Sequence, residues 1–195
     1  MTRFFDIVFS VLGLVVLSPL LLTVYLLIIA ESRGGGFYRQ ERIGKGGKPF
    51  LLYKFRSMRT GSAKSGLITV GGHDPRITRV GYFIRKYKID ELPQLLNVLK
   101  GDMSIVGPRP EVGKYVDLYT PEQRKVLTVR PGITDYASIE YADENEILGR
   151  AASPEEVYVK EILPDKIRYN MKYINNKSLA EYFKIIFLTA LRVVR

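Results

Sequence analysis

Residues 88–110 read KIDELPQLLNVLKGDMSIVGPRP, and this stretch decides the fold that we expect around it. Two adjacent carboxylates, Asp90 and Glu91, precede Pro93 and a run of leucines with helical spacing that ends at Gly101. An aspartate accepts free backbone N–H groups at a helix N-terminus, proline is tolerated in the first turn, and glycine suits a left-handed C-cap. The stretch therefore predicts a short helix that begins near Asp90 and holds both carboxylates at its N-terminus.

Cationic side chains surround this carboxylate pair in the sequence. The prolines of Gly107-Pro108-Arg109-Pro110 predict a rigid turn that presents Arg109. Cations, a helix N-terminus and a fixed arginine are typical of a phosphate site, where a carboxylate indicates a bridging divalent cation, a nucleophile or both. The alternative is that Asp90 only caps the helix and Glu91 only adds a favourable charge to its first turn. The cations before the pair are Arg76, Arg79, Arg85, Lys86 and Lys88.

The composition limits the chemistry that this chain can perform. Its 195 residues have room for one domain, and 30 Lys and Arg against 20 Asp and Glu give a net charge of +10. An anionic partner is therefore expected, whether nucleic acid, phospholipid or nucleotide. The chain has no cysteine and a single histidine, His73, which excludes thiol catalysis, disulfides and a multi-histidine metal site. A metal must be held by oxygen, which favours magnesium or manganese.

The N-terminal segment is long and apolar. Residues 7–30 carry no charge, and about 20 apolar residues suffice to span a bilayer. Ser18-Pro19 interrupts the segment, and proline in a helix interior predicts a kink whose freed carbonyls a serine hydroxyl can partly satisfy. One alternative is a single spanning helix. The other is a re-entrant helix that bends at Pro19 and leaves on the side it entered, because Arg3 and Arg33 place cations at both ends.

The remaining chain predicts an α+β fold, mainly helical with a small β-hairpin. We divide it into a membrane helix over residues 1–33, in which Arg3 and Asp6 are spaced to pair, and a body over residues 34–195 that begins at three glycines. Strands are expected over 37–43 and 49–58, which places Lys54 and Arg56 on one face. A polar loop covers 60–72, and a helix covers 80–87. Further helices are expected to start at Thr120, Ser153 and Ser178.

The last predicted helix, residues 179–195, is amphipathic and basic. Its apolar side carries Phe183, Phe187 and Leu191, flanked by Lys184 and Arg192. This pattern fits ordinary core packing, and it also fits a helix that lies on anionic lipid. We expect amphipathic interfacial helices beside the membrane segment.

The motifs together resemble one known family. They are YRQERIG at 38–44, YKFRSM at 53–58, DPRITRVG at 74–81, residues 88–110, and RPGIT at 130–134. In this order, after Ser18-Pro19, they resemble the bacterial sugar transferases, which are monotopic polyprenol-phosphate phosphoglycosyl transferases, in their minimal catalytic form. Asp135 departs from the pattern, because many members have glycine there, so no sugar preference is carried over.

The resemblance implies a location and a reaction. A re-entrant helix broken at Ser18-Pro19 would hold the catalytic body on the cytoplasmic face of the bacterial inner membrane. The enzyme would move a sugar 1-phosphate from a UDP-sugar to polyprenol (undecaprenyl) phosphate, which yields polyprenol-diphosphate-sugar and UMP at the first membrane step of glycoconjugate assembly. By position, Asp90 would be the nucleophile and a Mg²⁺ ligand, Glu91 its acid/base or electrostatic partner, and Arg109 a phosphate binder.

The chemistry of these residues agrees with that reaction. An aspartyl-phosphosugar intermediate divides a reaction between two anions into two steps, and Mg²⁺ offsets their repulsion. Two other functions stay open. A non-catalytic polyanion-binding membrane protein would leave the Asp90–Glu91 pair unexplained, and a membrane-anchored nucleotide-sugar hydrolase would need no lipid. We expect phospholipid but no nucleic acid as a partner, and we predict no oligomeric state. Further candidates for stabilising phosphoryl charge are Lys54, Arg56, Arg85 and Arg130.

Overall fold

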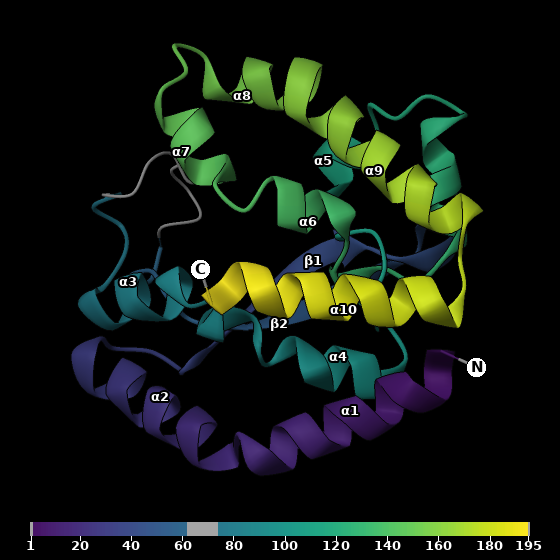
Figure 1. Ribbon diagram of the computed structural model, residues 1–195. Helices are drawn as coiled ribbons and strands as arrows, with labels where there is room; N and C mark the ends of the chain where they lie inside the picture. Colours follow the sequence, from purple (N-terminus) through teal and green to yellow (C-terminus); the bar gives the residue numbers. More distant parts are fainter. Residues whose placement is uncertain (1, 62–73, 195) are drawn as a thin grey trace.

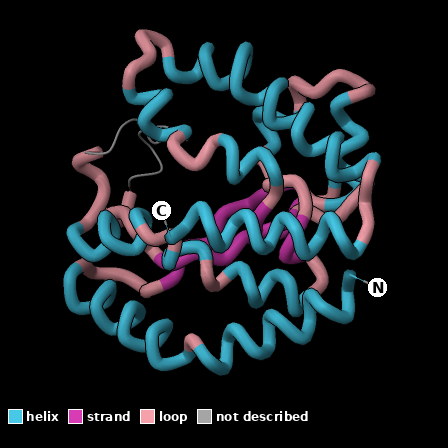
Figure 2. The backbone as a smooth tube through the Cα atoms, viewed as in Figure 1, coloured by secondary structure: helices cyan, strands magenta, loops and turns pink. Residues whose placement is uncertain are grey.

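The computed structural model describes residues 2–61 and 74–194, and it is mostly helical with two small two-stranded sheets (Figures 1 and 2). This confirms the predicted α+β class. The longest helices are α1 (Thr2–Val16), α2 (Ser18–Glu31), α9 (Leu163–Asn175) and α10 (Leu179–Val194). Helices α1 and α2 form a shallow V below the rest of the chain in Figure 1, with α4 (Gln94–Lys100) above α1 and α3 (Arg79–Lys86) above α2.

The V bends where the sequence predicts a kink. Helices α1 and α2 meet at an angle of 62°. Pro19 lies in the first turn of α2, and the hydroxyl of Ser18 donates a 2.7 Å hydrogen bond to the carbonyl of Val15. In the part of the chain that the structure describes, no single helix is long and apolar enough to cross a bilayer, although the bent pair satisfies length and composition together. Insertion into a membrane stays a prediction.

The free end of α1 is bound to the body. Arg3 donates to the carbonyls of Val98 (2.6 Å) and Leu99 (3.1 Å) in the last turn of α4, where carbonyls have no helical partner. Asp6 is buried and accepts hydrogen bonds from three groups, which are described below. The predicted pairing of Arg3 with Asp6 is therefore wrong, because each side chain finds better partners in the folded body.

Asp6 accepts a hydrogen bond from each of three groups that are far away in the sequence. They are the hydroxyl of Ser104, the N–H of Ile105 and the hydroxyl of Tyr182, each at 2.9 Å, and only 2% of Asp6 is exposed. A buried carboxylate is stable only when it is bonded in this way. Asp6 therefore joins α1 to α10 and to strand β3 (Ser104–Val106).

The other end of the V is bound as well. The carboxylate of Glu31 accepts the N–H groups of Arg79 (2.7 Å) and Val80 (2.9 Å) at the start of α3. Arg56 donates to the carbonyl (2.8 Å) and hydroxyl (2.9 Å) of Ser32. Both ends of the bent pair are thus held on the same body, and the bend lies at the bottom of the view in Figure 1, on the side opposite α8.

We expect Asp6→Ala to lower the free energy of unfolding by about 3 kcal/mol or more, because each buried donor left unpaired costs about 1–3 kcal/mol. Denaturant unfolding of the detergent-solubilised protein measures the change. Asp117→Ala is the control, because Asp117 is exposed. Equal stability of the two variants would show that the Asp6 bonds do not hold α1 in place.

The predicted hairpin is present but shorter than expected. Strands β1 (Phe37–Ile43) and β2 (Pro49–Phe55) pair antiparallel, with Phe37 opposite Phe55. The second strand ends at Phe55 instead of residue 58, so Arg56 has left the strand and does not share a face with Lys54. Most of the predicted loop over 60–72 lies outside the described residues.

The second sheet was not predicted, and it organises the site. Strands β3 (Ser104–Val106) and β4 (Gly132–Thr134) are parallel. A Cβ on Gly132 would lie 2.1 Å from the nitrogen of Gly107, and a Cβ on Gly107 would lie 2.5 Å from the carbonyl oxygen of Arg130. Only glycine permits this approach. Because the strands are parallel, the turn after β3, which carries Arg109, lies beside Asp135 after β4.

The three predicted helix starts have different outcomes. Thr120 and Gln123 form the expected reciprocal capping box, but a 3₁₀ turn, η4 (Gln123–Thr128), follows it. Ser153 precedes α8 (Pro154–Val157) without a side-chain cap. Ser178 accepts the N–H of Glu181 at 3.1 Å and begins α10 as predicted. The other elements are η1 (Lys45–Gly47), η3 (Ile89–Glu91), α5 (Gly113–Val116), α6 (Tyr136–Glu140), α7 (Glu144–Gly149) and the π-helical η5 (Tyr158–Ile162).

Helix α10 divides its apolar residues between core and surface. Tyr182 and Ile185 are entirely buried, whereas Phe183, Phe187 and Leu191 are exposed. The exposed side fits a helix at a lipid surface, which stays a prediction.

Candidate active site

Asp90 and Glu91 lie in the 3₁₀ turn η3 and not at the N-cap of α4. Pro93 is the N-cap residue of that helix, and Lys88 reverses the chain before the turn with a left-handed φ of 56°. The predicted capping role of Asp90 is therefore wrong. Gly101 ends α4 with a φ of 93°, as predicted.

Glu91 is fully engaged by two cations. The guanidinium of Arg109 binds both of its carboxylate oxygens, and Lys54 donates to one of them at 2.9 Å. Burial alone would raise the pKa of Glu91, but Arg109 and Lys54 hold it well below its usual range. Burial lowers the pKa of Lys54, against the attraction of Glu91. Arg109 and Lys54 thus favour the anionic form of Glu91, and Glu91 positions both cations.

Asp90 has the opposite environment. It is buried, yet within residues 2–61 and 74–194 no hydrogen bond or ion pair engages its carboxylate. Burial raises the pKa of Asp90, and the negative charge of the neighbouring Glu91 raises it further. The positive charges of Lys54, Arg85 and Arg109 act against this rise. The two adjacent carboxylates therefore differ: the oxygens of Glu91 are occupied by cations, whereas those of Asp90 can bind a metal or attack a substrate.

Asp135 holds the turn that carries Arg109. One of its carboxylate oxygens accepts the backbone N–H of Arg109 at 3.1 Å, and the other accepts the N–H of Ser138 at 2.6 Å, which caps α6. Asp135 is entirely buried. The residue that departs from the family pattern thus connects the end of β4 to the Arg109 turn.

A buried ionic cluster supports the other side of this turn. Glu111 accepts a 2.5 Å hydrogen bond from the hydroxyl of Tyr158, and it lies 3.5 Å from Arg42 and 3.6 Å from Lys166. Arg42 also donates to the carbonyl of Pro110 at 3.1 Å. The cluster fixes the residues after Arg109.

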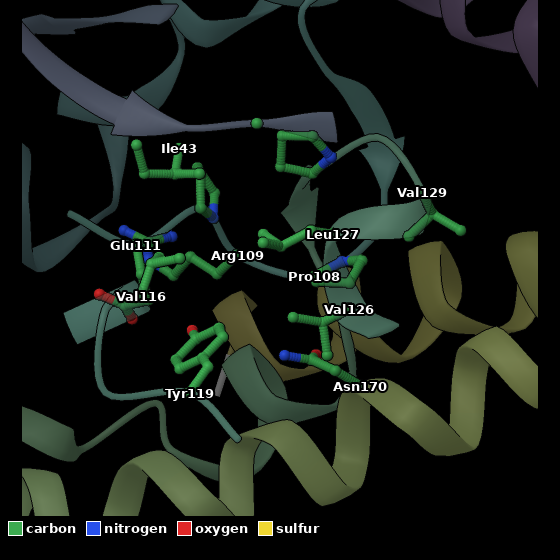
Figure 3. A pocket seen from close by; sticks show the side chains of 13 residues that line it. Ile43, Pro108, Arg109, Glu111, Val116, Tyr119, Val126, Leu127, Val129 and Asn170 are labelled. Carbon is green, nitrogen blue, oxygen red and sulfur yellow. The ribbon is translucent and has the colours of Figure 1, made fainter. Parts of the chain in front are cut away.

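Figure 3 shows a small cavity behind the same turn, with Pro108, Arg109 and Glu111 on one side and Tyr119 and Asn170 on the other. Its volume is about 20 Å³, which is room for one water molecule. The substrate must therefore approach Asp90 from elsewhere.

The predicted cations separate into two groups. Lys54 and Arg109 bind Glu91, and Arg85 is close enough to lower the pKa of Asp90. Arg56 instead binds Ser32, and the Nε of Arg130 donates to the carbonyl of Gly101 at 2.9 Å, beyond α4. Neither arginine contacts the carboxylate pair, because the guanidinium of each donates a hydrogen bond to a backbone carbonyl near a helix end.

The described residues hold no group of three or more Asp, Glu, His or Cys side chains that could enclose a metal. The buried carboxylate of Asp90 is nevertheless a suitable oxygen ligand. Magnesium in phosphoryl-transfer enzymes is commonly held by one or two carboxylates together with substrate phosphates. Asp90 therefore fits an oxygen-ligated ion such as Mg²⁺, whose binding stays a prediction.

Sequence reasoning missed the contacts that Asp6, Glu111 and Asp135 make in the fold. Asp6 had a usable signal, because an ionisable residue beside an apolar membrane segment is costly unless it has a partner in the fold. Glu111 directly follows the Arg109 turn, but its buried partners come from distant helices. Asp135 was noted only as a departure from the family.

Comparisons with known proteins agree on one group. A family model described as bacterial sugar transferase matches residues 1–195. The chain is 40% identical over 190 residues to a UDP-N-acetylgalactosamine-undecaprenyl-phosphate N-acetylgalactosaminephosphotransferase of Aeromonas hydrophila, covering 96% of this chain and 42% of that protein. It is 35% identical over 191 residues to a UDP-glucose:undecaprenyl-phosphate glucose-1-phosphate transferase of Escherichia coli (strain K12), covering 96% and 39%.

A third relative is close to this chain in length. The exopolysaccharide production protein PSS of Rhizobium leguminosarum bv. phaseoli is 39% identical over 194 residues, covering 96% of this chain and 92% of that protein. The chain spans about two fifths of the length of the first two relatives and nearly all of the third.

Proposed function

The chain belongs to the bacterial sugar transferase family, and on that premise we propose that it transfers a sugar 1-phosphate from a UDP-sugar to undecaprenyl phosphate. The products are undecaprenyl-diphosphate-sugar and UMP. The observation that carries this proposal is the buried carboxylate of Asp90, which no described residue engages, beside a Glu91 that holds Arg109 and Lys54. The names of two relatives specify the same class of donor and acceptor.

The proposed reaction has two steps at one phosphorus atom. A carboxylate oxygen of Asp90 attacks the phosphorus that bears the sugar, the bond to the bridging oxygen breaks, and UMP leaves. An oxygen of the lipid phosphate then attacks the same phosphorus, which releases the Asp90 carboxylate. Asp90 would hold a Mg²⁺ ion through its carboxylate, and the ion would supply neutralisation of the phosphate charge.

The neighbours of Asp90 stabilise the charge of this reaction. Arg109 and Lys54 are held by Glu91 before any substrate arrives, so they lose little freedom when a phosphoryl group approaches. Arg85 adds a third cation near Asp90. We assign Glu91 the electrostatic role, because its charge is already shared by two cations.

The test is UMP release from a panel of UDP-sugars, with magnesium and undecaprenyl phosphate. We expect stoichiometric UMP and lipid-linked sugar for at least one donor. A nucleotide-sugar hydrolase would yield UMP and free sugar phosphate without lipid, and a polyanion-binding protein would yield no UMP.

We further propose that the bent pair is re-entrant and that the body lies on the cytoplasmic face of the bacterial inner membrane. Support comes from both ends of the V, since Arg3 and Asp6 bind the same body as Glu31 and Ser32. A spanning helix would place one of these ends across the bilayer, away from its partners. The V also exposes an apolar surface that suits lipid, which includes Val8, Val11, Leu12, Val15, Val16, Leu20, Leu26 and Leu27.

The topology can be tested by cysteine labelling, because the chain has no native cysteine. We expect Thr2→Cys and Gly35→Cys to react with a membrane-impermeant thiol reagent only after the cells are permeabilised. Gly35 has open space around its Cα, so a side chain is tolerated there. Labelling of Thr2→Cys alone in intact cells would establish a spanning helix.

A further inference from the structure

An apolar pocket of about 270 Å³ lies inside the bend of the V, separate from the cavity of Figure 3. Both arms line it, through Leu14 of α1 and Leu22 of α2. The open end of the hairpin contributes Phe55, and the start of α4 contributes Pro93 and Leu96. Figure 1 shows these elements meeting above the V.

The lining determines what the pocket can bind. Its surface is almost entirely carbon, so it offers no recognition for a uracil base, a sugar or a phosphate. Burying a hydrocarbon there is favourable, at about 0.8 kcal/mol for each methylene group. The pocket volume of about 270 Å³ is close to the lower end of small-molecule sites, which is about 300 Å³. It leaves room for a short length of hydrocarbon chain. The chemical class is therefore a hydrocarbon chain.

Two residues that line the pocket lie within three positions of Lys54 or the carboxylate pair in the sequence. Phe55 lines the pocket, and the preceding residue, Lys54, binds Glu91. Pro93 lines the pocket and follows Glu91 by two residues, so their Cα atoms are at most about 7.6 Å apart. A chain in the pocket can thus have its polar end near Asp90.

We propose that this pocket holds the first isoprene units of the polyprenyl phosphate acceptor, so that the lipid phosphate is placed at Asp90. This inference rests on the proposed function and adds the place where the acceptor is recognised. A phospholipid also offers hydrocarbon and a phosphate, and the competition experiment below distinguishes it from the polyprenyl phosphate. The bend at Pro19 then has a chemical purpose, because a straight helix would not enclose the pocket.

The test narrows the pocket with Leu22→Trp. We expect the KM for undecaprenyl phosphate to rise about tenfold, because the free energy lost with about two buried methylene groups corresponds to about that factor. The KM for the UDP-sugar should stay unchanged. Leu26→Trp is the matched control, because Leu26 lies one turn along the same helix, is 51% exposed against 61% for Leu22, and does not line the pocket. Leu96→Trp narrows the pocket from α4 and should repeat the effect if Leu22→Trp fails to fold.

Direct binding separates this inference from the proposed function. Radiolabelled undecaprenyl phosphate in detergent should bind the parent protein and Leu26→Trp, and bind Leu22→Trp about tenfold more weakly. Equal affinity for the parent and both variants, or equal displacement by excess phosphatidylglycerol, would overturn the pocket assignment. If the parent releases no UMP from any UDP-sugar, the proposed function fails, and the binding result still decides the pocket.

Discussion

Asp90→Asn is expected to lower the rate of sugar-phosphate transfer on the order of 10³-fold or more, the size of effect seen when a nucleophile is removed. Asparagine keeps the shape of the side chain but has neither the charge nor the nucleophilic oxygen. Because no hydrogen bond or ion pair among the described residues depends on the Asp90 carboxylate, the variant should fold as well as the parent. UMP release at saturating donor and acceptor measures the loss.

The same residue should carry a covalent intermediate. When a labelled UDP-sugar and magnesium are supplied without lipid, we expect a labelled sugar phosphate on a peptide that contains Asp90, which disappears when undecaprenyl phosphate is added. Asp117→Asn is the control, since Asp117 is exposed. Turnover that persists in Asp90→Asn, or UMP release that strictly requires lipid, would favour direct attack by the lipid phosphate.

Arg109→Lys is expected to reduce kcat/KM about 10²-fold although the charge is kept. The guanidinium of Arg109 reaches both oxygens of Glu91 at once, and an ammonium group cannot reproduce that fork. The pKa of Arg109 is raised by Glu91, so it stays charged at any working pH. Steady-state kinetics with the best donor from the panel measures the change.

Arg130→Lys is the matched control for that variant. Arg130 also precedes a proline, but its guanidinium binds the carbonyl of Gly101 instead of the carboxylate pair. If both variants lose the same activity, Arg109 acts only as a general cation of the turn.

Local signals in the sequence were enough to predict several elements. The kink at Ser18-Pro19, the end of α4 at Gly101 and the hairpin each depend on residues that are neighbours in the chain. Proline and glycine act on their own backbone, so their effect does not depend on tertiary structure. The Ser178 cap was predictable for the same reason.

Side-chain partners were not predictable in this way. Arg3 and Asp6 are well spaced for a pair on one helix, yet the body offers Arg3 two terminal carbonyls and Asp6 three donors. Arg56 and Arg130 could not be separated from Lys54 and Arg109 by sequence, because the cations look alike until the fold places the carbonyls they bind. The parallel pairing of β3 with β4 was missed because each strand has only three residues.

The division of labour between the two carboxylates is also a tertiary property. The sequence identified Asp90 and Glu91 together, but their neighbours come from β2 and from the turn after β3. Only those neighbours make Glu91 a fixed anion and leave Asp90 available.

The hydrogen bond between Asp6 and Tyr182 has a consequence for how the protein is made. Its two residues are 176 positions apart. At roughly 5–20 residues per second, a ribosome needs roughly 9–35 s to add that length of chain. During this time the carboxylate of Asp6 lacks its Tyr182 partner, although α1 has already left the ribosome. Docking of α1 is therefore completed only late in synthesis. A chain stalled before α10 would expose an incompletely docked α1 to the quality-control proteases of the cell.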